Sequence, residues 1–153
     1  MKGLQSINGI VIGLLALVVV CMAGPGTVIA SDLELEQSVI GNKVVFTVNV
    51  NNAPNQVKSL GLDIKYDPLI LSFDSAVFSD TLIEDWYFKH VSNPQEGTLR
   101  FGGFTADDNT ISSGSSGALM EITFEVVDYG QCPVTIKALK DDVSGWGTRG
   151  AAF

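Results

Sequence analysis

Cysteine and histidine are almost absent from this sequence, and their scarcity excludes several kinds of chemistry. Two cysteines and one histidine occur in 153 residues. Cys21 lies in an apolar leader, so without that leader only Cys132 remains and the folded domain can form no internal disulfide. Cys132 is followed by Pro133 and opens an alternating apolar run, which favours a buried small hydrophobe over a reactive thiol.

Catalytic motifs are also lacking. The single histidine, His90, follows an aromatic stretch, Trp86 to Phe88, with no neighbouring nucleophile, so a solvated or satisfied imidazole is favoured over a general base. The sequence has no Gly-x-Ser-x-Gly, no His/Cys metal spacing and no phosphate-binding glycine loop. Carboxylates are numerous enough to form a glycosidase pair, but none stands in a recognisable context. We therefore predict that the protein is not an enzyme.

Basic residues are few compared with acidic ones. All 17 acidic residues follow position 31, together with eight of the nine basic residues, which leaves a net charge of about −9 once the leader is removed. Such a surface repels the phosphates of nucleic acids, so we exclude nucleic acid as a partner. The same surplus of charge keeps a protein soluble.

A long apolar run occurs only near the N-terminus. Lys2 is followed by an apolar segment, Ile10 to Ala23, and then by small residues. This order is typical of an export signal, so we predict a signal peptide over residues 1–30 and a secreted, extracellular or cell-surface domain over residues 31–153. The preferred cleavage site follows Ala30. The alternatives are cleavage after Ala23, an uncleaved anchor as the only membrane contact, and lipidation at Cys21.

The rest of the sequence is organised around a stretch of alternating residues, Leu60–Phe73. In its first half every second residue is apolar, which indicates a strand with one buried face. Pro68 has no backbone donor and disfavours the helical region at Asp67, so this strand must stop or bend at a Tyr-Asp-Pro corner. The second half predicts a new strand whose apolar row is Leu69, Leu71 and Phe73.

Similar alternation recurs along the chain after the leader. We predict at least seven short strands separated by turns and no helix of useful length, and therefore an all-β fold of two packed antiparallel sheets. The inward rows of these strands predict the core. Its expected members are Val44, Phe46, Val48, Leu62, Ile64, Leu71, Leu99, Phe101, Ile122, Phe124 and Ile136.

Two blocks of the sequence resemble cohesin modules. One is the Tyr66-Asp67-Pro68 corner with its flanking strands. The other, Leu99 to Val127, leads from a strand of small and aromatic residues through an Asp/Gly/Ser loop to a long alternating strand. The resemblance covers about Leu33 to Val143 and implies a jelly-roll β-sandwich. Cohesins usually close with one more strand, whereas this sequence ends at Phe153 without another alternating run, so we expect that strand to be missing or the fold to close differently.

The resemblance also implies a function and a site. Cohesins dock a calcium-loaded dockerin on a sheet face and so gather polysaccharide-degrading enzymes, using polar side chains early in the strand before the Asp-Pro corner. The corresponding positions here are Ser59 and Gly61. With the other outward residues of that strand and of the strand beginning at Thr98, the candidate partner-binding residues are Ser59, Gly61, Asp63, Lys65 and Arg100. We expect Arg100→Ala to weaken binding more than Lys65→Ala, with little loss of stability.

Two other functions stay open. Cohesins share their sandwich architecture with a group of cellulose-binding modules, in which exposed aromatic side chains form a platform for sugars. The candidates here are Trp86, Tyr87 and Trp146, although core and edge packing would explain the same residues. The sandwich could also serve only as a structural spacer at the cell surface.

Two acidic segments have the composition of a calcium site, Asp107-Asp108-Asn109 and Asp141-Asp142. Oxygen-rich loops suit hard cations, but the residue spacing of an EF-hand is absent. Turn formation explains the same residues more simply. We therefore predict no metal or cofactor, and keep Ca²⁺ at Asp107, Asp108 and Asn109 as the alternative.

Overall fold

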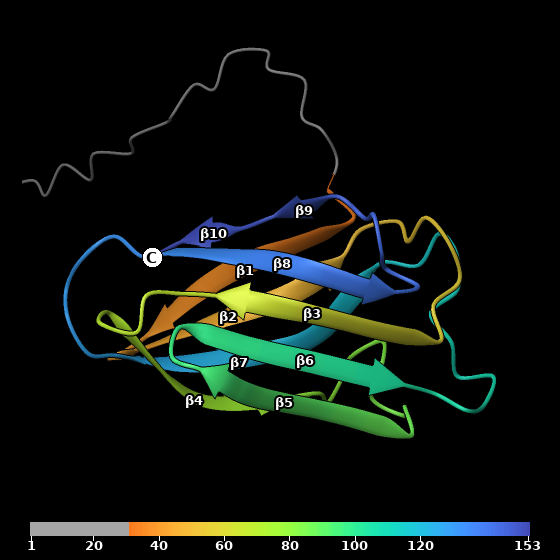
Figure 1. Ribbon diagram of the computed structural model, residues 1–153, viewed down its shortest axis with the longest axis horizontal. Helices are drawn as coiled ribbons and strands as arrows, with labels where there is room; N and C mark the ends of the chain where they lie inside the picture. Colours follow the sequence, from red (N-terminus) through yellow and green to blue (C-terminus); the bar gives the residue numbers. More distant parts are fainter. Residues whose placement is uncertain (1–30) are drawn as a thin grey trace, which may run out of the picture.

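The computed structural model describes residues 31–153, and the predicted signal peptide, residues 1–30, lies outside the described residues. The described chain forms two five-stranded sheets that pack face to face (Figure 1). The predicted all-β jelly-roll sandwich is therefore confirmed. Within this part of the chain we find no helix that could span a membrane.

One sheet, named the β3 sheet after its central strand, has the strand order β10-β8-β3-β6-β5. Its strands are β3 (Ser59–Lys65), β5 (Phe88–Gln95), β6 (Thr98–Phe104), β8 (Pro133–Asp141) and β10 (Ala151–Ala152). The other, the β2 sheet, has the order β4-β7-β2-β1-β9. Its strands are β1 (Leu33–Ile40), β2 (Lys43–Val50), β4 (Leu71–Val77), β7 (Gly117–Val126) and β9 (Thr148–Arg149).

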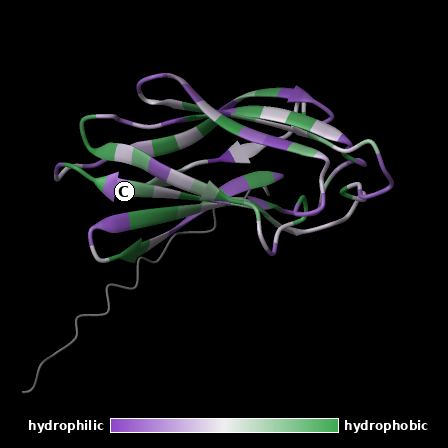
Figure 2. Ribbon diagram, turned by 90° about the horizontal axis from the view of Figure 1, so that it is seen from below, coloured by the Kyte–Doolittle hydropathy of each residue, from purple (hydrophilic) through white to green (hydrophobic). Residues whose placement is uncertain are grey.

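The core lies between the two sheets and confirms the predicted inward faces. Every member of the predicted core is buried. In β2 burial alternates strictly along the strand, and Figure 2 shows the same banding of hydrophobic and hydrophilic residues in other strands. Because successive side chains of a strand point to opposite faces, a register slip of one residue would carry a whole apolar row into water.

Asp67 organises the corner between β3 and β4. Its carbonyl oxygen accepts the amide hydrogens of Ile70 and Leu71 at 3.2 and 3.0 Å, and its carboxylate accepts that of Leu69 at 2.9 Å. The chain thus completes a turn while it crosses from the β3 sheet to the β2 sheet. The prediction that a strand begins at Leu69 is wrong, because Leu69 belongs to this turn with its side chain exposed, and β4 begins at Leu71.

Cys132 lies beside the same corner. Its side chain is fully buried, and its Sγ accepts the amide hydrogen of Asp67 at 3.2 Å. Burial raises the pKa of the thiol, which favours the protonated, unreactive form. The interpretation of Cys132 as a buried hydrophobe is confirmed.

The C-terminal segment adds one short strand to each sheet, where the sequence led us to expect a missing final strand or a different closure. β9 adds to the β2 sheet in parallel with β1, and β10 adds to the β3 sheet antiparallel to β8. The two pieces are only two residues long, so no alternation could reveal them in the sequence.

The crossing between β9 and β10 depends on a glycine. A Cβ built on Gly150 would lie 2.4 Å from the carbonyl oxygen of Val134, too close for any other residue. Beyond β10 the backbone of Phe153 exchanges two hydrogen bonds with that of Cys132, at 2.7 and 2.9 Å. The last residues of the chain are therefore tied to the sandwich.

Candidate functional site

The pairing of β3 with β6 brings the five predicted partner-binding residues onto one face. Ser59, Gly61, Asp63 and Lys65 alternate along β3 with core residues, and so point away from the β2 sheet. Arg100 lies opposite Asp63 in the register, and directly opposite residues of an antiparallel pair share a face. Gly61 and Asp63 are buried within this surface, whereas Ser59, Lys65 and Arg100 are accessible. Their role in binding remains a prediction.

Arg100 and Asp63 form a bidentate ion pair at the centre of this face. Arg100 Nε donates to Asp63 Oδ1 at 2.8 Å, and Arg100 Nη2 donates to Oδ2 at 3.0 Å. The hydrogen bond from Arg100 holds the pKa of Asp63 below its usual value against the opposing effect of burial, and the charges of Lys65 and Lys140 add to the lowering. The same hydrogen bond raises the pKa of Arg100. Asp63 is therefore an internal partner of Arg100 rather than a free contact group.

Because the pKa of Asp63 is lowered, the stability of the fold should depend on this residue in acid. An aspartate in the unfolded chain has a pKa of about 3.9, whereas the pKa of Asp63 in the folded protein is lower. The ionised Asp63 therefore stabilises the fold above about pH 4, and this contribution is lost as the pH falls through the folded pKa. We expect the urea midpoint of the wild type to fall more steeply below about pH 4 than that of Asp63→Asn, which cannot titrate. Asn109→Ala, in an exposed loop, removes no ionisable group; it is the control and should keep the wild-type slope. Equal slopes for the wild type and Asp63→Asn would contradict the assignment.

Two glycines that face each other create a hollow next to the ion pair. Gly61 of β3 lies opposite Gly102 of β6, and a cavity of about 310 Å³ opens over them on the outer face. A Cβ on Gly102 would meet no atom within 4 Å, and one on Gly61 would make only ordinary contacts, at 3.5 Å or more. Neither glycine is thus required by packing within the domain. The space above them is free for a side chain of another molecule.

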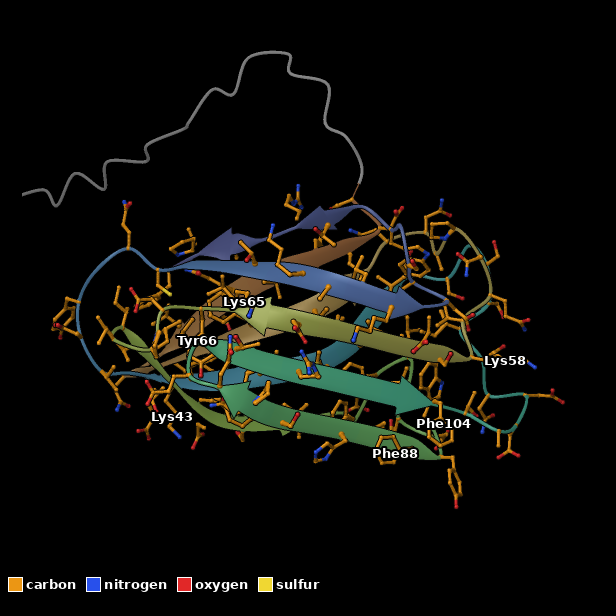
Figure 3. The ribbon with its side chains drawn as sticks, viewed as in Figure 1. Lys43, Lys58, Lys65, Tyr66, Phe88 and Phe104 are labelled. Atoms are coloured by element: carbon orange, nitrogen blue, oxygen red, sulfur yellow. The ribbon has the colours of Figure 1, made fainter. Side chains whose placement is uncertain are left out.

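Two exposed aromatic rings, those of Phe88 and Phe104, border this hollow on one side, and Tyr87 lies next to them. Phe88 and Phe104 stack at 5.4 Å between ring centroids with 21° between the planes, and Tyr87 lies 5.9 Å from Phe104. Their exposed fractions are 44% for Phe88, 42% for Phe104 and 77% for Tyr87. Figure 3 shows Phe88 and Phe104 together at one end of the β3 sheet, with Lys65 toward the other end.

The hollow is also bordered by Phe88, Phe104 and Lys140, which are not among the site residues predicted from the sequence. Phe104 shares an alternating face with Arg100 and Gly102 in the sequence, and this signal could have found it. Phe88 and Lys140 join the site only through the pairing of β5 with β6 and of β8 with β3. No local pattern predicts which strands become neighbours.

The predicted sugar platform is wrong for its two tryptophans. Trp86 is only 4% exposed and Trp146 only 7%, and the indole Nε1 of Trp146 donates to Asn55 Oδ1 at 2.9 Å. Trp86 packs beneath Gly103, where a Cβ would lie 3.3 Å from the indole ring. Both rings therefore fill the sandwich. Of the three candidates only Tyr87 is exposed.

The two acidic segments are both exposed. Asp107, Asp108 and Asn109 lie in the loop after β6. The carboxylate of Asp142 accepts the backbone amide hydrogens of Lys58 and Ser59 at 2.8 and 3.0 Å, so it ties that loop to the start of β3. Within residues 31–153 no three histidine, cysteine or acidic side chains lie close enough together to hold a metal ion.

The two sheets, the Asp-Pro corner and the arrangement of the β3 face define a jelly-roll β-sandwich module. The chain belongs to the cohesin domain family, because the model of the cohesin domain matches residues 30–144. The search of curated proteins gave no match.

Solved cohesin structures share this fold at low sequence identity. The sixth cohesin of scaffoldin B from Acetivibrio cellulolyticus, solved in complex with a mutant Cel5 dockerin, superposes with a TM-score of 0.61 at 14% identity, covering 80% of this chain and 96% of that chain. A non-cellulosomal cohesin from the archaeon Archaeoglobus fulgidus gives 0.61 at 16% identity, covering 80% and 88%. A type II cohesin from the Acetivibrio cellulolyticus cellulosome gives 0.60 at 17% identity, covering 81% and 95%.

Proposed function

We propose that this protein is a non-catalytic docking module that binds a dockerin-like domain on the outer face of the β3 sheet. Membership of the cohesin family supports a protein-binding role, and a structural neighbour was solved with a dockerin. The single observation that carries the proposal for this chain is the hollow over Gly61 and Gly102, bordered by exposed aromatic rings and by Arg100. In this role the protein would be secreted and would hold dockerin-bearing partners in extracellular assemblies that degrade polysaccharides.

The residue types and the shape of the β3 face are typical of a protein interface. Aromatic residues and arginine are enriched at interface centres, and residues that contribute most to binding pack in desolvated pockets. Here Phe88 and Phe104 border the hollow on one side and Arg100 borders it near the middle of the sheet. The ion pair with Asp63 fixes the Arg100 guanidinium before a partner arrives, which reduces the conformational entropy lost on binding.

A sugar-binding function is the second candidate, and the exposure of Tyr87 beside Phe88 and Phe104 favours it. The three rings do not form one flat platform, since the planes of Tyr87 and Phe104 meet at 42°. Protein docking is therefore the better supported function of the same surface.

Calorimetric titration with any dockerin module that the genome encodes beside this protein tests the proposal. Substitutions at Arg100 and Lys65 test whether the β3 face is the binding surface. Arg100 borders the hollow, whereas the ammonium of Lys65 lies farther along β3 and donates to Thr98 Oγ1 at 2.6 Å. We expect Arg100→Ala to weaken dockerin binding more than Lys65→Ala, by more than about tenfold against less than about threefold.

The structure changes the expectation for stability. Removing Arg100 leaves the buried carboxylate of Asp63 without its partner, so Arg100→Ala should also lower the melting temperature. Arg100→Lys keeps the positive charge but loses the bidentate hydrogen bonding to Asp63, and therefore serves as the control for charge alone. A soluble cellulose oligomer is the competing ligand. Heat with the oligomer and none with any dockerin would overturn protein docking in favour of sugar binding.

A further inference from the structure

We infer that the partner presents an acidic surface to the outer face of the β3 sheet. This inference rests on the proposed function and adds the chemistry of the partner to it. The observation behind it is that the two outer faces of the sandwich carry opposite charge, although the described chain as a whole is strongly acidic.

The outer face of the β3 sheet is basic. Lys137 and Lys140 of β8 lie opposite Asp63 and Gly61 of β3, so they share the face of these two residues. The cations of the face are Lys65, Arg100, Lys137 and Lys140. Two carboxylates border the hollow: Asp63, which already accepts both hydrogen bonds from Arg100, and Asp141 at the end of β8. The positive charge therefore exceeds the negative charge here.

The two β8 lysines are available to a partner. None of the ion pairs that form within residues 31–153 includes Lys137 or Lys140, and both side chains are exposed. The stem of Lys140 lies over Gly61, with its Cβ 3.5 Å and its Cδ 3.9 Å from where a glycine Cβ would be. A lysine stem that covers apolar surface keeps its ammonium in water. The ammonium of Lys140 is thus held at the rim of the hollow.

The outer face of the β2 sheet is acidic. Its carboxylates are Glu34, Glu36, Asp74, Glu121 and Glu125. Its two cations are already paired: Lys43 contacts Asp74 at 2.9 Å and Glu125 at 3.9 Å, and Arg149 contacts Glu34. A basic partner would be attracted to this face and away from the hollow.

This separation of charge selects both the partner and its orientation. Complementary potentials raise association rates and place the partner in register, while like charges oppose the wrong encounter. An acidic protein surface is repelled by most of this domain and attracted only by the face that carries the hollow. We therefore expect carboxylates of the partner next to the side chain that enters the hollow, where they meet Lys140 and Lys137.

The first experiment uses defined probes and needs no identified partner. A short glutamate peptide and a short lysine peptide are each titrated into the protein, and binding is followed by the chemical shifts of its backbone amides. We expect the glutamate peptide to shift amides of β3, β6 and β8, and to bind more weakly as the Debye length falls from about 30 Å at 0.01 M salt to about 8 Å at 0.15 M. Shifts confined to the β2 sheet, or a lysine peptide bound at the hollow, would overturn the inference.

The second experiment measures association with a dockerin module at both salt concentrations. The variant Lys137→Gln/Lys140→Gln should slow association about tenfold at low salt and much less at high salt. The matched control, Lys43→Gln/Arg149→Gln, removes the same charge from the acidic face and should not slow association. Melting temperatures of both variants show whether each is folded.

The outcomes separate this inference from the proposed function. A dockerin that binds at a rate unaffected by salt and by the β8 substitutions would leave docking intact and refute the acidic partner. If no dockerin binds but the glutamate peptide still maps to the β3 face, the dockerin assignment fails and the acidic partner stands. Self-association at low salt, seen by sedimentation and abolished by Lys137→Gln/Lys140→Gln, would identify the acidic β2 face of a second copy as the occupant. The dockerin assignment would then fail, whereas the acidic partner would stand.

Discussion

Replacing Gly102 by leucine is expected to weaken docking strongly without damage to the fold. Gly102 lies at the floor of the hollow, and a side chain there would meet no atom of the domain within 4 Å. A leucine would instead occupy the space that a partner side chain needs. Loss of a central, well-packed contact typically reduces affinity by at least about thirtyfold, or about 2 kcal/mol. Titration of the variant with a dockerin that binds the wild type measures this effect.

Two control variants show whether the effect is specific to the hollow. Thr47→Leu adds the same side chain to the outer face of β2, on the opposite sheet, and should bind like the wild type. Gly103→Ala changes the neighbouring residue, whose Cβ would lie 3.0 Å from the ring of Phe101 and 3.2 Å from the carbonyl oxygen of Phe88. This variant should lower the melting temperature, unlike Gly102→Leu. Wild-type affinity for Gly102→Leu would show that the partner binds elsewhere.

Replacing Phe124 by alanine is expected to destabilise the fold by about 3–5 kcal/mol. Phe124 of β7 is completely buried and has three aromatic neighbours. Its ring centroid lies 5.8 Å from that of Phe46, 4.8 Å from Tyr66 and 6.2 Å from Phe73. The substitution leaves a cavity between the sheets and removes the edge-on contacts with Phe46 and Phe73.

Urea unfolding of the variant measures this loss, and Glu121→Ala is the control. Glu121 lies on the same strand but on the outer face, exposed to water. An exposed substitution of this kind usually changes stability by less than about 0.5 kcal/mol. If Phe124→Ala unfolds at the same urea concentration as the wild type, the inward face of β7 has been assigned incorrectly.

Much of the fold could be predicted from residues that are neighbours in sequence. Strict alternation in β2, β3, β6 and β7 identified these strands and their buried faces, because a strand with one wet side must place every second residue in the core. The Asp-Pro corner was predicted because proline lacks a donor and restricts the residue before it. The same alternation placed Arg100 and Gly102 on one face of their strand.

Features without a local signature could not be predicted in this way. Leu69 continues an apolar row but lies in a turn, because the carbonyl oxygen of Asp67 accepts the amides of both Ile70 and Leu71. β9 and β10 are too short to show a period, and their places depend on the sheet edges that receive them. Trp86 and Trp146 are of a residue type that occurs both in cores and on binding surfaces, so only tertiary packing decided that they are buried.

By itself the sequence determined that the protein is an all-β sandwich and, for the clearest strands β2, β3, β6 and β7, which side chains face the core and which face outward. Only the tertiary structure decided which strands are neighbours in a sheet, and therefore which outward side chains lie side by side. The hollow exists because Gly61 and Gly102, far apart in the chain, lie opposite each other, and Phe88 and Lys140 reach it from two further strands. The separation of basic and acidic faces arises in the same way. Side-chain alternation depends on the geometry of a single strand, whereas strand order and register are set by burial and backbone pairing summed over the whole domain.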